Sequence, residues 1–102
     1  MKLLTKEIER KLPSIRATEN QGMQAIAQVK FFSPWSDWTW YGVEYDPASK
    51  TFYGMVDGFA REMGLFELGE LESVTGPFGL KIERDMYFEP TKLSELLSGH
   101  RS

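Results

Sequence analysis

The chain has 102 residues, enough for one core and too few for two, so we predict a single domain over residues 1–102. A composition that is 41% hydrophobic and 26% charged excludes a disordered or fibrous protein. The net charge is −3: residues 1–30 hold six Lys and Arg against three Asp and Glu, and residues 31–102 hold six against twelve. This acidic body disfavours nucleic-acid binding through clustered basic residues.

Cysteine usage and hydropathy predict a location. The chain contains no cysteine, which excludes disulfides and thiolate metal sites and fits a reducing compartment. Charges such as Lys6, Glu7 and Arg10 interrupt the apolar run that a signal peptide needs, and no stretch approaches the roughly 20 apolar residues of a membrane span. We therefore expect a soluble, cytoplasmic protein without a membrane partner.

The first third of the chain predicts a helix, a loop and a strand. Thr5 can cap a short helix through about Leu12, and Pro13 stops it. Residues 17–22 are polar, lack periodicity and predict a loop. Residues 25–32 alternate as a strand does, and a turn at residues 33–37 follows. The predicted core-facing residues of this strand are Ala25, Ala27, Val29 and Phe31.

Residues 38–45 are the strongest strand prediction, and this strand carries aromatic side chains on both faces. A turn at residues 46–50 leads to a third strand at 51–59, where Gly54 and Gly58 can leave room for a large cross-strand ring. One face of the strand at 38–45 is predicted to hold Thr39, Tyr41, Val43 and Tyr45, and the other Trp38, Trp40, Gly42 and Glu44.

The last part of the chain predicts a short strand at 65–68, helical turns at 70–74 that bury Leu71 and Val74, and a turn at 76–79. A brief extended segment around residues 80–84 precedes a C-terminal helix that begins near Pro90 and ends at Gly99. The fold class is therefore predicted as α+β, with an antiparallel meander sheet of three to four strands packed with an N-terminal and a C-terminal helix. The apolar stripe of the last helix is Leu93, Leu96 and Leu97.

Aromatic residues are in excess and crowd between residues 31 and 53. Large rigid rings can anchor a protein partner or stack on bases, because they bury much area at low entropic cost. The alternative is that these rings fill the core of a small domain. We expect Trp35, in the turn, to be the most exposed tryptophan. The candidate binding residues of this aromatic hairpin are Trp35, Trp38, Trp40 and Tyr41.

Two charged groups are weaker candidates. Glu83, Arg84 and Asp85 could pair carboxylates for acid and base chemistry, but their spacing carries no specificity, and a local salt-bridge set that holds the C-terminal segment on the sheet is the simpler interpretation. In that set, planar bidentate pairing would suit a buried Arg84. An acidic row could imitate DNA phosphates, although a net charge of −3 is weak for that role and a solvated face is simpler. The row consists of Glu67, Glu70 and Glu72, with Glu83, Asp85 and Glu89 possible neighbours.

No pattern predicts a catalytic, metal or cofactor site. The single histidine, His100, lies in a tail that we expect to fray, so it is not held as a base or ligand needs to be. The turn at 76–79 lacks the Gly-Lys-Ser/Thr ending of a phosphate loop. We therefore predict a protein that is not an enzyme and binds no metal or cofactor.

Several segments carry a family resemblance. They are Leu3-Leu4-Thr5 with Leu12-Pro13, Val29-Lys30-Phe31-Phe32, Trp38-Thr39-Trp40-Tyr41, Glu44-Tyr45-Asp46, Glu67-Leu68-Gly69-Glu70-Leu71-Glu72-Ser73, and Gly79-Leu80-Lys81-Ile82-Glu83-Arg84-Asp85 leading into Phe88-Glu89-Pro90. These segments resemble the bacterial domain-of-unknown-function family 2958 over nearly the whole chain. That family consists of short proteins of plasmids, integrative elements and phages, sometimes encoded near or fused to antirestriction-type domains. The resemblance implies a habitat and supplies no catalytic residues.

Three hypotheses for function follow. The first is a non-enzymatic accessory protein of a mobile element that binds an unidentified protein through the aromatic hairpin and the adjoining acidic surface; interference with a host defence enzyme is its sharpest version. The alternative is a single-stranded nucleic-acid-binding protein that stacks bases on the tryptophans, which steep salt dependence would reveal. Its phosphate contacts would be Arg10, Lys11, Arg16 and Lys30. The third is an enzyme that uses Glu83 or Asp85, which would need a concave pocket around them. An exposed strand edge could also make a dimer through sheet extension.

Overall fold

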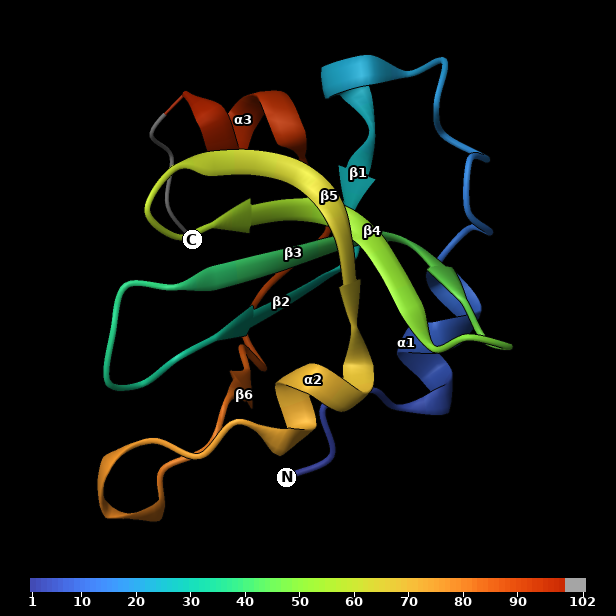
Figure 1. The fold of residues 1–102 in the computed structure, drawn as a ribbon. Helices are drawn as coiled ribbons and strands as arrows, with labels where there is room; N and C mark the ends of the chain where they lie inside the picture. The colour runs from blue at the N-terminus through green and yellow to red at the C-terminus, as the bar shows by residue number, and fades with distance from the viewer. Residues whose placement is uncertain (99–102) are drawn as a thin grey trace.

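The computed structural model describes residues 1–98, which form an α+β fold around one five-stranded antiparallel sheet and one two-stranded sheet (Figure 1). The large sheet has the order β5-β4-β3-β2-β6 and consists of β2 (Val29–Phe32), β3 (Thr39–Asp46), β4 (Thr51–Asp57), β5 (Arg61–Glu67) and β6 (Glu83–Arg84). The small sheet pairs β1 (Ile26–Ala27) with β7 (Thr91–Lys92). The α-helices are α1 (Lys6–Lys11), α2 (Leu68–Ser73) and α3 (Leu93–Leu97), and the 3-10 turns are Gly22–Gln24 and Pro77–Gly79.

The α+β class and the two terminal helices are confirmed, but the prediction of three to four strands was wrong because the large sheet has five. The additional strand is β6, which lies in the predicted extended segment and pairs with Phe31 and Phe32 at the end of β2. A second unexpected strand, β7, pairs with β1 next to the start of α3. A strand of two residues is too short to show an alternating pattern, so the sequence does not predict it and only its pairing with another strand identifies it.

The predicted helix at the N-terminus is confirmed. The hydroxyl oxygen of Thr5 accepts a hydrogen bond from the Ile8 amide at 3.2 Å, and the helix ends at Lys11, before Leu12 and Pro13. Its first turn is acidic and its last turn basic, which suits the helix dipole. Leu12 is buried directly after the helix, so α1 is attached to the sheet through its C-terminal end.

A bulge in β3 changes which side chains share a face. The register with β4 shifts between Gly42 and Glu44, so Val43 is an extra residue in the strand. Tyr41 and Val43 therefore pack in one hydrophobic cluster and Tyr45 in the other. The prediction that these three side chains share a face was wrong for Tyr45.

The predicted strand at 25–32 is interrupted at Gln28, which separates β1 from β2. All four residues predicted to face the core are buried. However, Ala25 and Ala27 pack in the cluster of Tyr41, whereas Val29 and Phe31 pack in the cluster of Tyr45. Because neighbouring residues of a strand point to opposite faces, the two clusters lie on opposite sides of the large sheet. The chain thus changes sides at Gln28.

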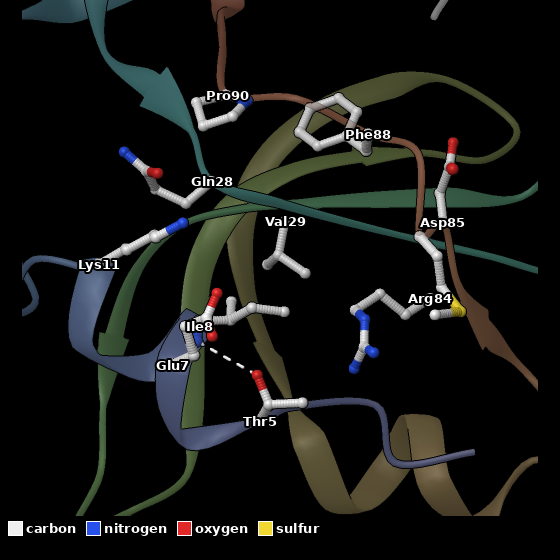
Figure 2. Close-up of a pocket in the computed structure, with 11 residues that line it drawn as sticks. Thr5, Glu7, Ile8, Lys11, Gln28, Val29, Arg84, Asp85, Phe88 and Pro90 are labelled. Carbon is white, nitrogen blue, oxygen red and sulfur yellow. Dashed lines mark hydrogen bonds between the residues drawn. The ribbon is translucent and has the colours of Figure 1, made fainter.

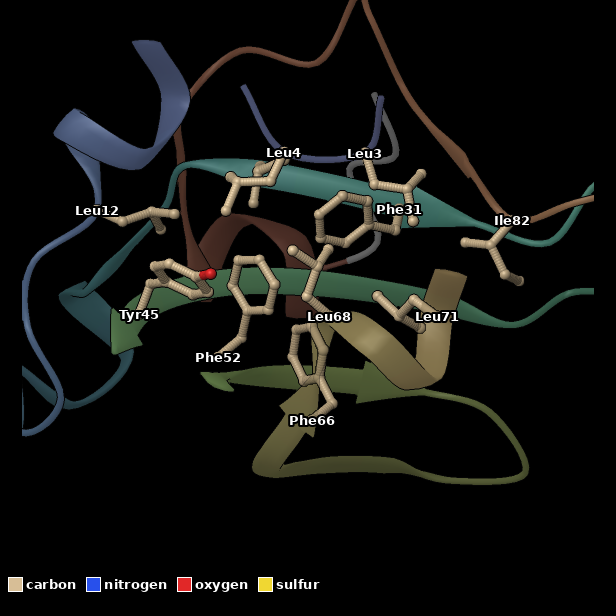
Figure 3. Packing of buried hydrophobic residues seen from close by; sticks show 11 residues of the cluster. Leu3, Leu4, Leu12, Phe31, Tyr45, Phe52, Phe66, Leu68, Leu71 and Ile82 are labelled. Carbon is tan, nitrogen blue, oxygen red and sulfur yellow. The ribbon is translucent and has the colours of Figure 1, made fainter. Parts of the chain in front are cut away.

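The first face of the sheet is covered by the N-terminal segment and α2 (Figure 3). At its centre lies the fully buried ring of Phe52, whose centroid is 4.6 Å from that of Tyr45, 5.1 Å from Phe66 and 5.5 Å from Phe31. Rings of this kind prefer offset or edge contacts at such distances. The side chains that cover them are Leu3, Leu4, Leu12, Leu68, Leu71 and Ile82.

The second face is covered by β1 and α3, through Ala25, Ala27, Leu93 and Leu96. The predicted burial of Leu93 and Leu96 is confirmed, but Leu97 is 40% exposed and belongs to no stripe. The predicted helix end at Gly99 and the predicted fraying around His100 lie outside the described residues. Both faces of the central strands are thus covered by the chain itself, so an open sheet face is not the binding surface.

Helix α2 begins earlier than predicted, at Leu68. The carboxylate of Glu67 accepts from the Glu70 amide while the Glu70 carboxylate accepts from the Glu67 amide, which forms a capping box. Leu71 is buried as predicted, but Val74 is 38% exposed because it follows the helix in extended conformation. The strand before the helix, β5, is also longer than the predicted 65–68 and pairs along its whole length with β4.

A buried carboxylate holds the long loop between α1 and β1. Glu44 is 2% exposed, and its two carboxylate oxygens accept hydrogen bonds from the Arg16 amide at 2.7 Å, the Thr18 amide at 2.8 Å and the Thr18 hydroxyl. Arg16 has φ of 75°, in the left-handed region that a non-glycine residue adopts at a cost. These hydrogen bonds satisfy the buried Glu44 carboxylate and hold Arg16 in its unfavourable backbone conformation.

Candidate functional site

Three loops lie at one end of the large sheet: residues 33–38 between β2 and β3, 58–60 between β4 and β5, and 74–82 between α2 and β6. The first loop contacts each of the other two. Figure 1 shows all three on the left side of the molecule. Tryptophans connect them. A Cβ built on Gly58 would lie 2.5 Å from the Trp38 ring, and one built on Gly76 would lie 2.5 Å from the Trp35 ring. We name this region the aromatic end; its members are Trp35, Trp38, Trp40, Phe59 and Phe78.

One part of the aromatic end is built on the β4–β5 hairpin. Phe59 is 96% exposed, and its ring meets the half-buried Trp38 edge to face at 5.3 Å and 84°. Trp38 lies 5.9 Å from Trp40, which is packed against the first hydrophobic cluster. Gly58 is required here because any side chain would occupy the place of the Trp38 ring. The prediction that Gly58 leaves room for a large ring is confirmed, although β4 ends at Asp57 and Gly58 lies in the turn.

The other part is built on the loop after α2. Phe78 is fully exposed, and its φ of 58° places it in the left-handed region. The turn that holds it is closed by the Gly76 amide, which donates to the Leu80 carbonyl at 2.7 Å. For a residue other than glycine this backbone conformation costs about 1 kcal/mol or more, and full exposure of the ring recovers none of it. The fold therefore does not explain this ring, which makes it a candidate for function.

The predicted hairpin residues are only partly brought together. Trp38 and Trp40 lie in the aromatic end, and so does Trp35, which packs against the first cluster; all three tryptophans are half-buried. Tyr41 is 8% exposed and packs 5.9 Å from the Phe88 ring, in the second cluster. Tyr41 is thus a core residue, and the aromatic end is formed without it.

Sequence reasoning missed Phe59 and Phe78. Both stand beside glycine in short turns, as Gly58-Phe59 and as Phe78-Gly79. An aromatic residue in a predicted turn has no strand face to fill, so its position alone was a usable signal of exposure. The prediction that the third strand extends to Phe59 concealed this signal, because β4 ends at Asp57.

The group Glu83, Arg84 and Asp85 does not form a site of its own. The Arg84 guanidinium donates to the backbone carbonyls of Lys2 and Leu3, the latter at 3.1 Å, so the predicted pairing of Arg84 with carboxylates was wrong. Asp85 instead forms an ion pair with Lys30 at 3.5 Å and accepts from the Tyr87 amide at 2.9 Å. The predicted role of the group, to hold the C-terminal segment against the sheet, is supported by the Lys30 contact.

Replacing Arg84 by Ala is expected to destabilise the protein by about 2 kcal/mol, because charged donors to backbone carbonyls contribute roughly 1.5 to 3 kcal/mol. Urea unfolding measures the loss, and amide hydrogen exchange should become faster in the N-terminal segment first. Replacing Lys81, whose ammonium donates to the exposed Thr75 hydroxyl, is the control and should change stability by less than about 0.5 kcal/mol. An equal loss of stability in both variants would contradict the role of Arg84 in holding the N-terminal segment.

A groove of about 440 Å³ lies between α1, β2 and the segment after β6 (Figure 2). Its floor is Val29, and Ile8 and Phe88 contribute further apolar lining. Asp85 lines it, so the pocket that an enzyme would need exists, but Glu83 does not take part. Because Asp85 and Arg84 already make the structural contacts described above, we interpret the groove as the boundary where the N-terminal helix packs beside the C-terminal segment.

The acidic and basic candidates take different places. Glu70 and Glu72 are exposed on α2, next to the loop that carries Phe78, and Glu83 is half-buried in β6. Arg10 and Lys11 are on α1, which Figure 1 places on the side opposite the aromatic end. Arg16 pairs with Glu19 at 3.1 Å and Lys30 with Asp85. The tryptophans and the basic residues of the nucleic-acid hypothesis therefore do not converge on one surface.

Two pKa shifts arise at the other end of β3. Burial raises the pKa of Tyr45, and the negative charges of Glu9, Glu72 and Asp46 act in the same direction. A hydrogen bond from the Ser49 hydroxyl at 2.7 Å lowers the pKa of Asp46. Tyr45 packs in the first hydrophobic cluster, and Asp46 is the last residue of β3.

Comparisons with known proteins give one finding. A family model described as "Protein of unknown function (DUF2958)" matches residues 3–100. Neither the curated proteins nor the solved structures provide a match to this chain. In residues 1–98, no three His, Cys, Asp or Glu side chains form a group able to hold a metal ion, and no helix is long and apolar enough to cross a membrane.

Proposed function

This chain belongs to the DUF2958 family, and from its aromatic end we propose that it is a small, non-enzymatic protein-binding module. The observation that carries the proposal is the placement of two fully exposed phenylalanines, Phe59 and Phe78, on two loops joined by half-buried tryptophans. We propose that the aromatic end docks on a partner protein, with the acidic surface of α2 at its rim.

The energetics favour an anchor role for these rings. Exposed aromatic side chains reduce solubility and return nothing to folding, whereas aromatic anchors surrounded by half-buried contacts dominate the binding energy of many interfaces. The Trp38 ring packs against Gly58 and lies 5.9 Å from the Trp40 ring, so little side-chain entropy remains to be lost on binding. The aromatic end is therefore preorganised for binding.

A protein partner is favoured over single-stranded nucleic acid by charge. Nucleic-acid binders combine stacking rings with a basic groove along the backbone. The charged residues in and beside these loops include the acidic Asp37, Asp57, Glu70 and Glu72 and the basic Arg61 and Lys81. Arg61 is paired with Asp57, and the basic residues of α1 lie on the opposite side, so acidic residues predominate here. A protein partner with a basic rim fits this distribution better.

We further propose, from the family resemblance, that the module is a cytoplasmic accessory protein of a mobile genetic element. Plasmids, integrative elements and phages meet host defence enzymes when they enter a cell. A host defence enzyme is therefore the partner class that we propose first, with interference by occlusion of its working surface as the mode of action.

The test compares a double variant, Phe59→Ser with Phe78→Ser, with the unchanged protein. Both rings are fully exposed, so stability should change by less than about 0.5 kcal/mol, while loss of two interface anchors should weaken partner binding at least about 30-fold. A tagged protein captures partners from host lysate treated with nuclease, and the captured partner is then purified and its affinity measured by calorimetry.

The matched control is Tyr87→Ser, which removes a 93% exposed ring from the segment after β6. It should bind the partner as the unchanged protein does. Equal affinity of the double variant and the unchanged protein would contradict the proposal, and so would capture that disappears on nuclease treatment.

A further inference from the structure

Strand β5 is the long open edge of the large sheet. In the part of the chain that the structure describes, β5 pairs with β4 alone, over all seven residues of Arg61–Glu67 and in continuous register. Figure 1 shows it as the outermost strand on its side of the sheet. The opposite edge, β6, has only two residues. An edge of seven residues without proline is a template for pairing with another strand.

The backbone hydrogen bonds that flank the β4–β5 ladder show which groups of β5 point outward. The Gly58 amide donates to the Ala60 carbonyl at 3.2 Å, and the Leu68 amide donates to the Lys50 carbonyl at 3.0 Å. In an antiparallel ladder, hydrogen-bonded and non-hydrogen-bonded pairs alternate. The even-numbered residues between Ala60 and Leu68 therefore turn their amides to β4. The residues whose amides and carbonyls face the open edge are Arg61, Met63, Leu65 and Glu67.

These four residues are symmetric about Gly64. If two copies of β5 pair antiparallel around a two-fold axis at Gly64, every outward-facing residue meets an outward-facing residue of the partner. Arg61 then lies opposite Glu67 of the second copy, and Met63 lies opposite Leu65 of the second copy. Within one chain Arg61 pairs with Asp57 at 3.2 Å and donates to the Leu97 carbonyl, and Glu67 caps α2, so the contact between copies adds to these bonds. Both pairings occur twice, as an isologous interface requires. A shift of the axis to residue 63 or 65 would leave an end unpaired and would lose both Arg–Glu pairs.

We propose that this protein forms a homodimer by antiparallel pairing of β5 with β5 of a second copy around Gly64, which joins the two large sheets into one. The charge order of the strand, basic at Arg61 and acidic at Glu67, is complementary to its own reverse. The pairing also covers Leu65, a leucine that is 66% exposed in the single chain, with Met63 of the second copy. The proposal rests on the edge alone and is independent of the proposed function.

The geometry at the axis provides a direct test. Gly64 of each copy forms a non-hydrogen-bonded pair with its own equivalent, where Cα atoms are about 4.5 Å apart and both Cβ atoms point to the same face. This separation permits a disulfide. A Cβ built on Gly64 meets nothing within 4 Å, so a cysteine fits there, and because the chain has no cysteine of its own the engineered thiol is unique.

The first experiment is oxidation of Gly64→Cys, with Gly69→Cys as matched control because a Cβ on Gly69 of α2 also meets nothing within 4 Å. Pairing brings the two engineered thiols at the axis to an effective concentration in the millimolar range, so at micromolar protein the disulfide dimer should form at least about tenfold faster than in the control. The product is measured on a non-reducing gel. Equal rates in the two variants would overturn the proposal.

The second experiment measures mass in solution by light scattering. The unchanged protein should have twice the chain mass of 11.7 kDa. Leu65→Pro removes an amide that faces the open edge and none that faces β4, so this variant should have the mass of one chain and an unchanged circular dichroism spectrum. A single-chain mass for the unchanged protein at millimolar concentration, or a dimer that persists in Leu65→Pro, would overturn the proposal. If Leu65→Pro fails to fold, the rates of the two cysteine variants decide.

Discussion

Replacing Gly54 by Ala is expected to destabilise the protein by about 3 kcal/mol or more, the largest effect that we predict for a single methyl group. A Cβ on Gly54 would lie 1.8 Å from the Tyr41 carbonyl oxygen and 2.9 Å from the Tyr41 carbonyl carbon. Both are backbone atoms of β3, the central strand of the sheet, which is paired with β2 on one side and β4 on the other. The clash therefore cannot be relieved by rotation of a side chain.

The control lies directly across the ladder. Gly64 is the register partner of Gly54 on β5, and a Cβ there meets nothing within 4 Å. Gly64→Ala should leave stability unchanged or raise it by up to about 1 kcal/mol, because alanine loses less backbone entropy than glycine on folding. Urea unfolding of both variants measures the difference. A Gly54→Ala variant as stable as Gly64→Ala would contradict the close approach of β4 to β3.

Replacing Glu44 by Ala is expected to cost about 3 to 5 kcal/mol. The carboxylate is buried and accepts from two backbone amides and one hydroxyl, so its removal leaves the Arg16 and Thr18 amides without their acceptor. Each buried donor left unsatisfied costs roughly 1 to 3 kcal/mol. The loop after α1 loses its anchor in the same step, and Arg16 should become a site of rapid cleavage by trypsin. Urea unfolding and timed proteolysis measure the two effects.

The stability of Glu44→Gln should lie between those of the unchanged protein and Glu44→Ala, because the glutamine amide oxygen still accepts a hydrogen bond while its NH₂ group faces other donors. Glu62→Ala, an exposed glutamate on β5, is the neutral control and should change stability by less than about 0.5 kcal/mol. Slow cleavage at Arg16 in the Glu44→Ala variant would show that the loop is held by other contacts.

The contrast between Gly54 and Gly64 illustrates what a sequence leaves open. Both are glycines within strands, and sequence reasoning assigned Gly54 to room for a cross-strand ring such as Trp38 or Trp40. The structure places the Tyr41 backbone against Gly54 and the Trp38 ring against Gly58 instead. Residue type alone cannot tell whether a glycine faces a neighbouring backbone, a ring or open space, because the answer depends on strands that are distant in sequence.

The candidate site, too, could be predicted only in part from the sequence. Trp38 and Trp40 lie together as predicted, since they are two residues apart in sequence, and their role in binding stays a prediction. Phe59 and Phe78 were missed because the aromatic end is formed by three loops that are distant in sequence. The positions of these loops depend on the register of the sheet and on the contacts of Trp35 with Gly76 and of Trp38 with Gly58. Tyr41 was counted in the site because burial under Phe88 is not visible in the strand itself.

By itself the sequence determined the α+β class, the capped helix at Thr5, the central hairpin of β3 and β4, and the burial of Leu71, Leu93 and Leu96. These features depend on local capping, turn residues and side-chain period, which a short segment contains completely. Only the tertiary structure decided the fifth strand, the bulge at Val43 that turns Tyr45 to the other face, and the burial of Glu44 under the loop after α1. Each of these depends on a partner that is distant in the sequence, whose position is set by packing of the whole domain and not by any local pattern.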